Sequence, residues 1–297
     1  MNMLRWNILV LVASLLVVSP ISASAASHYD IKKVSDSVYA AVALPSGKAG
    51  SNALIVVADY HVIVAGAHFV PEAVKELLQE IAKITYFPLR EVILTHHHSG
   101  YNYLDLDLPA NASIFTSWQT WRALDSEYRR VKNPVTIFEN ALTLQRGKLS
   151  IVLSNTGKGH STGDVIVYIP SEDVLFTSDL LFNGVVGYMG NGHMRDWVLT
   201  LEMLQSLQAA KVIPGVGDVT DGRGIDRFLL FTRDFLTEVL RHVENGHNLA
   251  QTKKHFSLPQ YQDVPGYKTF FNVNIERAYS EFKGVVPQPE EPSSSPK

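Results

Sequence analysis

The chain of 297 residues contains no cysteine. Disulfide bonds and thiolate ligands are therefore excluded, and any metal held by side chains must be bound by histidine, aspartate or glutamate. The sequence also lacks an excess of charge of either sign, because its formal net charge is only -3. A basic surface is not expected, so we predict no nucleic-acid partner. Since 46% of the residues are hydrophobic, the chain can form one large packed domain or two small ones.

A long apolar run occurs only near the N-terminus. Arg5 supplies a positive charge, Ile8 to Val18 is almost entirely apolar, and Ala23-Ser24-Ala25 is a small-x-small cleavage sequence. This pattern predicts a secretory signal peptide over residues 1–25, cleaved before Ala26. The alternative is a membrane anchor, but the run is shorter than the span of about 20 residues that a transmembrane helix needs. We therefore expect a periplasmic or secreted mature protein without a membrane span.

The opposite end of the chain has a different composition. Four prolines, three serines and two glutamates lie between Pro287 and Lys297, with almost no apolar residue. Such a segment cannot bury enough apolar surface to fold, so we predict a disordered tail over residues 286–297. Residues 26–285 are then expected to form the folded domain.

Hydrophobic periodicity predicts clusters of strands in both halves of the chain, with helices between and after them. Strands are expected at Val38–Leu44, Ala53–Ala58, His61–Ala65, Val92–Leu94, Ala112–Thr116, Leu149–Leu153, Val165–Ile169, Val174–Thr177 and Lys211–Pro214. Helices are expected at Pro71–Ile84, from Ser117 to about Arg130, and at Asp196–Gln208, Asp226–Glu244 and Val273–Phe282. This order is typical of two sheets packed together with helices outside them.

The most distinctive stretch is Val92 to Asn102, which reads V-I-L-T-H-H-H-S-G-Y-N. Its apolar start predicts a buried strand, and three consecutive histidines follow Thr95 at the carboxyl end of that strand. Because side chains alternate along extended backbone, His96 and His98 can point to one side and His97 to the other. Two neutral imidazoles on one side are a ready pair of ligands for zinc. The alternative is a polar strand end with solvated histidines.

Two further positions share this structural setting. His160 lies in a Gly-rich loop between predicted strands, and Asp179 follows the strand that ends at Thr177. Taken alone, a loop histidine can bond to backbone and an aspartate can cap a turn. Together with His96 and His98, they complete a set that can bind one zinc ion and lower the pKa of its water to ~7. Iron and manganese are the alternative metals.

The other histidines show no such partner pattern and are expected at the surface or in helices: His61, His68, His242, His247 and His255. His242 also enters a second motif match. Gly159-His160-Ser161-Thr162-Gly163 fits the nucleophile elbow G-x-S-x-G, and Asp179 and His242 follow in the order of a hydrolase triad. The elbow requires a helix directly after its serine, whereas Asp164 to Ile169 is β-branched and predicts a strand. A serine hydrolase is therefore disfavoured.

A series of short motifs runs through most of the chain. They are Ser51-Asn52, Thr95-His96-x-His98, Gly159-His160-Ser161-x-Gly163-Asp164, Phe176-Thr177-Ser178-Asp179 and Pro214-Gly215-x-Gly217. In this order they resemble the metallo-β-lactamase superfamily, from about Val34 to Phe282. The resemblance implies an α/β fold, a four-layer αββα sandwich, with the metal site along one edge of the paired sheets. It also implies that His96, His98 and His160 hold a first metal and that Asp179 commonly bridges to a second.

Several positions depart from the family pattern. Gly100 and Tyr101 stand where an aspartate and a histidine usually follow the first motif, Val216 replaces a histidine, and Gly66 replaces an aspartate. Glycine and valine have no coordinating side chain, and neutral tyrosine is a poor ligand. We therefore predict one metal ion, with Asp179 as its fourth ligand or as hydrogen-bond partner and base for its water. Polar residues expected near this site are Tyr101, Asn102, Tyr188, His193 and Asp218.

These observations predict an exported metal-dependent hydrolase, in which metal-bound water attacks an ester, lactone, amide or similar bond of a small molecule. The alternative is a catalytically inactive relative that serves as a periplasmic binding or interaction module. The departures at the second-metal positions favour the inactive relative. Retention of three histidines and Asp179 favours the enzyme. The fold by itself does not identify the substrate.

Overall fold

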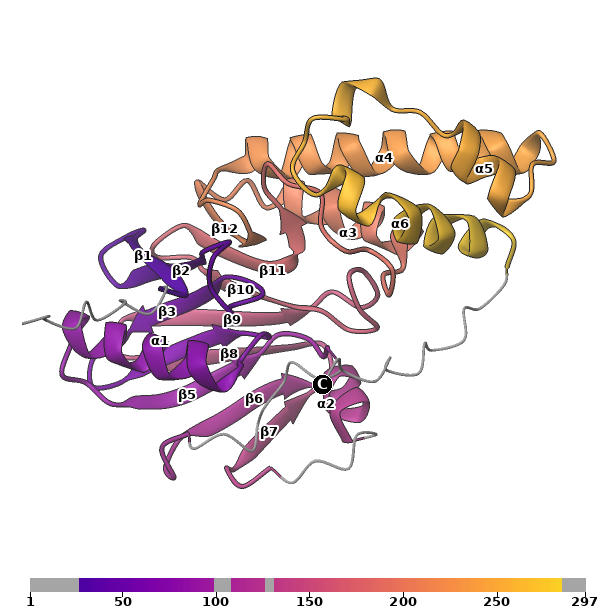
Figure 1. Cartoon of the computed structure of the whole chain (residues 1–297). Helices are drawn as coiled ribbons and strands as arrows, with labels where there is room; N and C mark the ends of the chain where they lie inside the picture. The colour runs from indigo at the N-terminus through magenta and orange to yellow at the C-terminus, as the bar shows by residue number, and fades with distance from the viewer. Residues whose placement is uncertain (1–26, 99–107, 126–130, 285–297) are drawn as a thin grey trace, which may run out of the picture.

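The computed structural model describes residues 27–98, 108–125 and 131–284. The predicted signal peptide and tail lie outside these ranges, as do Gly100, Tyr101 and Asn102. Within the described ranges, two β-sheets pack together and helices cover their outer faces (Figure 1). No helix in these ranges is both long and apolar enough to cross a lipid bilayer. The predicted αββα sandwich is confirmed.

The first sheet has seven strands, which follow one another in chain order from β1 to β7. Their bounds are β1 Tyr29–Lys33, β2 Val38–Ala43, β3 Ala53–Val57, β4 Val62–Gly66, β5 Leu89–Leu94, β6 Ser113–Ser117 and β7 Val135–Phe138. Strands β1 to β4 pair antiparallel, whereas β4 to β7 are parallel. Helix α1 (Pro71–Ile84) connects β4 to β5, and α2 (Trp118–Asp125) connects β6 to β7. Such crossovers bring the carboxyl ends of parallel strands to the same sheet edge.

The second sheet has five strands in the order β12-β11-β10-β9-β8. Their bounds are β8 Ala141–Arg146, β9 Leu149–Asn155, β10 Val165–Ile169, β11 Val174–Phe182 and β12 Lys211–Val216. Only β11 and β12 pair in parallel, and α3 (Met194–Ser206) lies between them in the chain. The chain then forms α4 (Gly222–Glu244), α5 (Leu249–His255), a 3-10 turn at Pro259–Tyr261 and α6 (Tyr267–Phe282).

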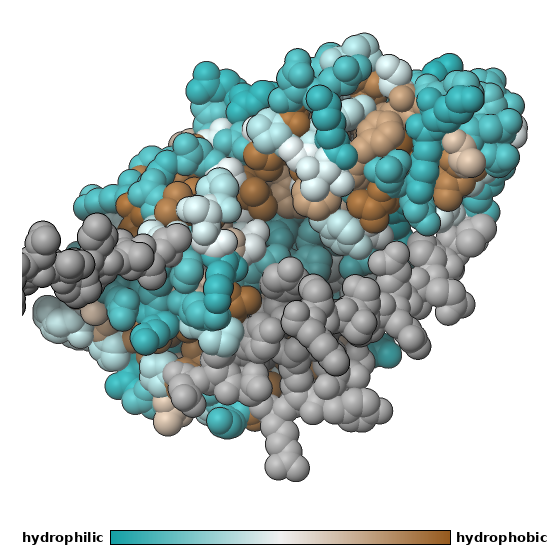
Figure 2. All heavy atoms as spheres, viewed as in Figure 1, coloured by the Kyte–Doolittle hydropathy of each residue, from teal (hydrophilic) through white to brown (hydrophobic). Residues whose placement is uncertain are grey.

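The apolar residues divide among three cores because strand side chains alternate between the two faces of a sheet. Along β5, Ile93 packs between the sheets, whereas Val92 and Leu94 pack with α1. The third core joins α3, α4 and α6 to β11 and β12 and contains Trp197 and Phe235. Figure 2 shows hydrophilic residues over most of the visible face, with small hydrophobic areas between them. Because of the three cores, both faces of each sheet are packed, and the site described below lies on this scaffold.

Most predicted elements lie within a few residues of the observed ones, and α1 and β10 have the predicted bounds. The structure adds β1, β7, β8 and α5, which are short elements. The prediction that β11 ends at Thr177 was wrong, because the strand continues to Phe182. Ser178 has a φ of 48°, and pairing with β12 is irregular on both sides of it. Asp179 therefore lies within an irregular strand and not in a loop after it.

Asn52, directly before β3, links the two sheets through its buried side chain. Its Oδ1 accepts a hydrogen bond from the backbone N–H of Ala43 at 2.8 Å. Its Nδ2 donates to the carbonyl oxygens of Pro214 and Gly217, each at 2.8 Å. The backbone N–H of Asn52 also donates to the Gly215 carbonyl. The motif Ser51-Asn52 thus fixes the start of β3 to the end of β12.

We predict that Asn52→Ala lowers the free energy of unfolding by about 2–4 kcal/mol, because buried backbone groups lose their partners. Urea unfolding followed by circular dichroism measures this change. Asn140→Ala, at an exposed turn, is the matched control and should change stability by less than about 0.5 kcal/mol. Equal stability of the two variants would contradict the role of Asn52.

Candidate metal centre

Two neighbouring parallel strands of the first sheet deliver three histidines to one edge. Strand β4 ends at Gly66, which pairs with Leu94 at the end of β5. His68 follows β4 by two residues, and His96 and His98 follow β5. Because both strands run in the same direction, the segments after them begin side by side.

The second sheet supplies two more donors to the same edge. His160 lies in the connection between β9 and β10, and Asp179 lies on β11. The backbone N–H of Val165, at the start of β10, donates to the Thr95 carbonyl at 2.8 Å. The hydroxyl oxygens of Thr95 and Ser178 are 2.8 Å apart. These two contacts join the sheets directly beside the histidines.

The five donor groups lie close together in a buried cluster around Asp179. Its Oδ2 is 3.2 Å from His68 Nε2, 3.6 Å from His96 Nε2 and 3.8 Å from His160 Nε2. His98 Nε2 is 2.6 Å from His160 Nε2. The relative exposures of His96, His160 and Asp179 are only 1%, 3% and 3%, so the surrounding water screens these groups weakly.

The electrostatics of the cluster follow from burial and proximity. Burial and the neighbouring His96 lower the pKa of His160 to about 3. Burial, His160 and His96 also lower the pKa of His98 far below its ordinary value. Burial opposes the ionisation of Asp179, but His68 and His96 outweigh it and hold the pKa of that carboxyl well below its usual range. His98 and His160 are therefore neutral at pH 7, and Asp179 is ionised.

His96 differs from the other two histidines of the first-metal set. Burial opposes its protonation, but the contact with Asp179 outweighs burial and raises the pKa of His96 above its ordinary value. Its Nδ1 lies 3.3 Å from the Thr95 hydroxyl and 3.5 Å from the Ser178 hydroxyl. These hydroxyls fix the orientation of the ring, so its Nε2 is directed towards Asp179.

A divalent metal ion fits this donor set. Imidazole and carboxylate groups suit zinc and iron, and burial of a charged carboxylate is costly unless it is paired or coordinates a metal. Among the described residues, the buried atoms Asp179 Oδ1 and His160 Nδ1 have no hydrogen-bond partner. His68, His96, His98 and Asp179 each offer one ligand atom, and these atoms all lie within 4.8 Å of one another.

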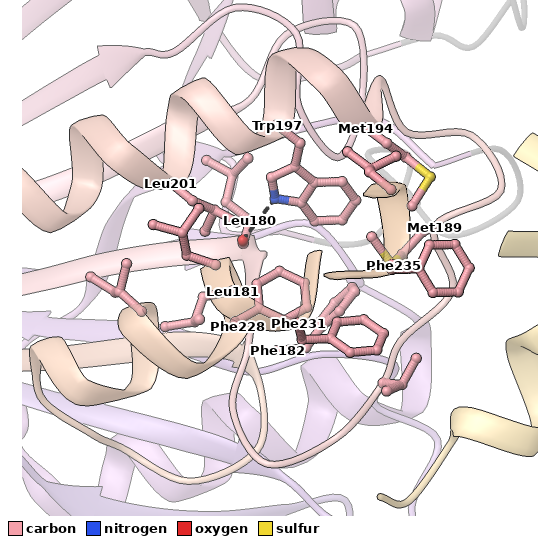
Figure 3. Packing of buried hydrophobic residues seen from close by; sticks show 14 of the residues in the cluster. Leu180, Leu181, Phe182, Met189, Met194, Trp197, Leu201, Phe228, Phe231 and Phe235 are labelled. Atoms are coloured by element: carbon pink, nitrogen blue, oxygen red, sulfur yellow. Dashed lines mark hydrogen bonds between the residues drawn. The ribbon is translucent and has the colours of Figure 1, made fainter. Parts of the chain in front are cut away.

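His160 is held in place by the third core. Its ring centroid is 5.2 Å from that of Trp197 and 5.9 Å from that of Phe182. Trp197 is fully buried, and its indole N–H donates to the Leu180 carbonyl at 2.9 Å (Figure 3). Figure 3 shows this indole surrounded by leucine, methionine and phenylalanine side chains. A rigid apolar support therefore lies behind one of the candidate ligands.

A cavity of about 670 Å³ opens beside the cluster. His68, His98, His160 and Asp179 form its polar wall. The other side chains that line it are mainly apolar or aromatic: Phe182, Val185, Val186, Tyr188, Val216, Pro265 and Phe270. The described lining contains no lysine or arginine. Its size lies in the range of small-molecule sites, roughly 300–1,000 Å³.

The amino-acid sequence of this chain is similar to those of known metallo-β-lactamases. A family model described as the metallo-β-lactamase superfamily matches residues 78–216. A metallo-β-lactamase type 2 of Bacillus cereus is 23% identical over 196 residues, which cover 63% of this chain and 73% of the relative. In sequence and in fold the chain is similar to the metallo-β-lactamase superfamily. A further relative, metallo-β-lactamase type 2 of Bacillus sp. (strain 170), is 24% identical over 196 residues, covering 63% of this chain and 72% of the relative.

Solved structures of metallo-β-lactamases share the fold. The metallo-β-lactamase from Pontibacter korlensis has a TM-score of 0.61 at 21% identity, covering 69% of this chain and 99% of that structure. The DIM-1 metallo-β-lactamase has a TM-score of 0.58 at 22% identity, covering 70% of this chain and 98% of that structure. At these identities the likeness concerns the fold.

The structure brings together the four residues predicted as metal ligands, His96, His98, His160 and Asp179. Tyr188 lines the cavity. Asp218 is largely exposed and forms an ion pair with Lys32. His193 lies just before α3, where its backbone N–H donates to the Gly159 carbonyl. Tyr101 and Asn102 lie outside the described residues.

The nucleophile-elbow alternative does not fit the geometry. The chain enters strand β10 at Val165, shortly after Ser161, where an elbow requires a helix. The Ser161 hydroxyl donates to Asp164 Oδ1 at 2.8 Å, and its oxygen accepts from the Gly163 N–H. Burial raises the pKa of this Asp164 carboxyl. Ser161 therefore shapes the loop that carries His160.

The expectation that His68 lies at the surface or in a helix was wrong. Its side chain is only 12% exposed and lies in the connection between β4 and α1, against Asp179. A lone histidine in that connection carries no local spacing signal. His68 could have been identified only indirectly. If β4 is assumed to pair in parallel with β5, the residues after both strands lie at the same sheet edge, and His68 comes close to His96.

Gly215 provides the space that Asp179 occupies. A Cβ atom at Gly215 would lie 2.1 Å from Asp179 Oδ1 and 2.6 Å from the Asp179 backbone nitrogen. The first glycine of the motif Pro214-Gly215-x-Gly217 is therefore required by close packing on β11. Displacement of the carboxylate would disturb the centre of the cluster.

We predict that Gly215→Ala weakens zinc binding at least about 10-fold, because the added methyl group displaces Asp179. Competition with a chromophoric chelator measures the affinity. Gly222→Ala is the matched control, because a Cβ at Gly222 meets no atom within 4 Å. Unchanged affinity in Gly215→Ala would show that Asp179 does not contribute to the centre.

Proposed function

We propose that this protein is a member of the metallo-β-lactamase superfamily and an exported metal-dependent hydrolase that cleaves an ester, lactone or amide bond of a small molecule. The observation that carries the proposal is a buried histidine and aspartate cluster that opens into a small-molecule cavity. Zinc is the preferred ion, and a single ion is favoured by Gly100, Tyr101 and Val216 at the second-metal positions. Export is supported by the sequence pattern of residues 1–25.

A divalent ion bound here would supply Lewis acidity and lower the pKa of water at the site to ~7. The residues of the chain have separate tasks. His96, His98 and His160 offer imidazole nitrogens, and the Thr95 and Ser178 hydroxyls orient His96. Asp179, held ionised among these histidines, can accept a hydrogen bond from the attacking water and so orient it. Asp179 lines the cavity, so this acceptor would lie near the scissile bond of a substrate held there.

The cavity lining favours a neutral and largely apolar substrate. Phe182, Val185, Val216 and Phe270 offer dispersion contacts and no hydrogen bonds. A substrate carboxylate placed among these side chains, away from the metal cluster, would lose its hydration without gaining a lysine or arginine partner in the described lining. An acyl group of a few apolar carbons next to the scissile carbonyl matches this environment.

We predict about one zinc ion per chain in the mature protein, purified without a metal-binding tag, because the clustered imidazoles and the carboxylate provide enough donors for one ion. The variant His96→Ala/His98→Ala should contain less than about a tenth of this amount. Atomic emission spectrometry measures the metal, and a screen of ester, lactone, β-lactam and phosphoester substrates measures activity. The hydrolysis found for wild type should disappear in His98→Ala and on removal of the metal by a chelator.

His255→Ala, at the end of α5, is the matched control and should keep both metal and activity. Two ions per chain would contradict the single-ion part of the proposal. A folded wild-type protein without metal would contradict the hydrolase and favour the inactive binding module.

We predict that p-nitrophenyl butyrate is cleaved with a kcat/KM at least about 10-fold higher than the p-nitrophenyl monoester of succinate, which carries a terminal carboxylate. The two acyl chains have the same length, so the comparison isolates the charge. Release of p-nitrophenol at pH 7 measures both rates. A preference for the anionic ester would contradict the apolar assignment of the cavity.

A further inference from the structure

His68 is held in a defined position beside the cluster. The connection between β4 and α1 is short, because β4 ends at Gly66 and α1 begins at Pro71. Phe69, the next residue, is buried in the core under α1. The backbone N–H of Thr95 donates to the Gly66 carbonyl, which fixes this connection against the segment that carries His96. The His68 ring is therefore placed by its neighbours on both sides.

Gly50 determines the direction in which the His68 ring points. A Cβ atom at Gly50 would lie 2.1 Å from His68 Nδ1, so the ring lies directly against the backbone of Gly50. Its Nε2 then points into the cluster, 3.2 Å from Asp179 Oδ2. The ring centroid is 5.3 Å from that of His98 and 6.1 Å from that of His96.

The distances fit a shared ion. Two ligand atoms at about 2.0–2.1 Å from one tetrahedral zinc ion are about 3.3 Å apart. The separation of His68 Nε2 and Asp179 Oδ2 is 3.2 Å, and that of His96 Nε2 and Asp179 Oδ2 is 3.6 Å. His68 thus satisfies the same geometric condition as His96, which the sequence motif had identified.

We propose that His68 is a metal ligand, so that this chain offers four imidazoles and one carboxylate as possible donors to the centre. The inference rests on the proposed function only in requiring that the cluster binds a divalent metal. His68 stands on the cavity side, where the chain has Val216 and no histidine in the Pro-Gly-x-Gly motif. The connection after β4 thereby supplies a ligand that none of the sequence motifs contains.

The test uses cobalt(II) alone as the probe, because its visible absorption reports the number and type of its ligands. Wild-type protein, His68→Ala, Gly50→Ala and His61→Ala are titrated with Co²⁺ after removal of bound metal. Gly50→Ala keeps the imidazole but displaces its ring, so it tests position without deleting the donor. His61→Ala is the matched control, because His61 lies at the opposite end of β4, 3.5 Å from Glu91. Far-UV circular dichroism confirms that each variant is folded.

We expect His68→Ala and Gly50→Ala to bind Co²⁺ at least about 10-fold more weakly than wild type, with an altered visible spectrum. His61→Ala should match wild type in both. A folded His68→Ala variant with wild-type affinity and spectrum would overturn the inference and leave the proposed hydrolase standing. A weakened affinity with an unchanged spectrum would also overturn it, because His68 would then act only through Asp179. Absence of Co²⁺ binding by wild type would overturn the proposed function itself.

Discussion

The buried carboxylate of Asp179 is the constraint on which the rest of this structure depends. A charge removed from water is tolerated only where partners surround it, and here imidazoles from three different segments do so. Gly215 leaves room for the carboxylate, and the residue before it, Ser178, has a left-handed φ where the pairing of β11 with β12 is irregular. A left-handed φ at a non-glycine residue costs free energy, so this feature is typical of a functional position.

The two sheets are joined where the cluster lies, which makes the site a product of sheet packing. Thr95 meets Ser178 and Val165 across the interface, and Asn52 fixes β3 to the end of β12. Removal of any of these contacts would loosen the relation between donors from different sheets. The helices packed on the outer face of each sheet hold the donor residues in place. The core around Trp197, for example, supports the ring of His160.

Similarity to the metallo-β-lactamase superfamily accounts for the architecture but leaves the chemistry to particular residues. Gly66 and Val216 have no coordinating group, yet the same edge of the sandwich brings His68 to Asp179. The cavity next to them is mainly apolar in its described lining. The fold therefore fixes where the site lies, and the donor residues determine whether a metal can bind. Only the cavity lining bears on the substrate.

The sequence by itself determined the strands and helices whose periodicity is strong, such as α1 and β10, and the candidate ligand pair His96 and His98, because their spacing is local. It also indicated His160 and Asp179 through motifs, although β11 was predicted to end too early at a polar Thr-Ser-Asp run. Only the tertiary structure decided the roles of His68, Gly50 and Gly215. Each depends on atoms from a segment distant in sequence, brought close by the parallel pairing of β4 with β5 and of β11 with β12. No spacing within one segment can encode such a contact.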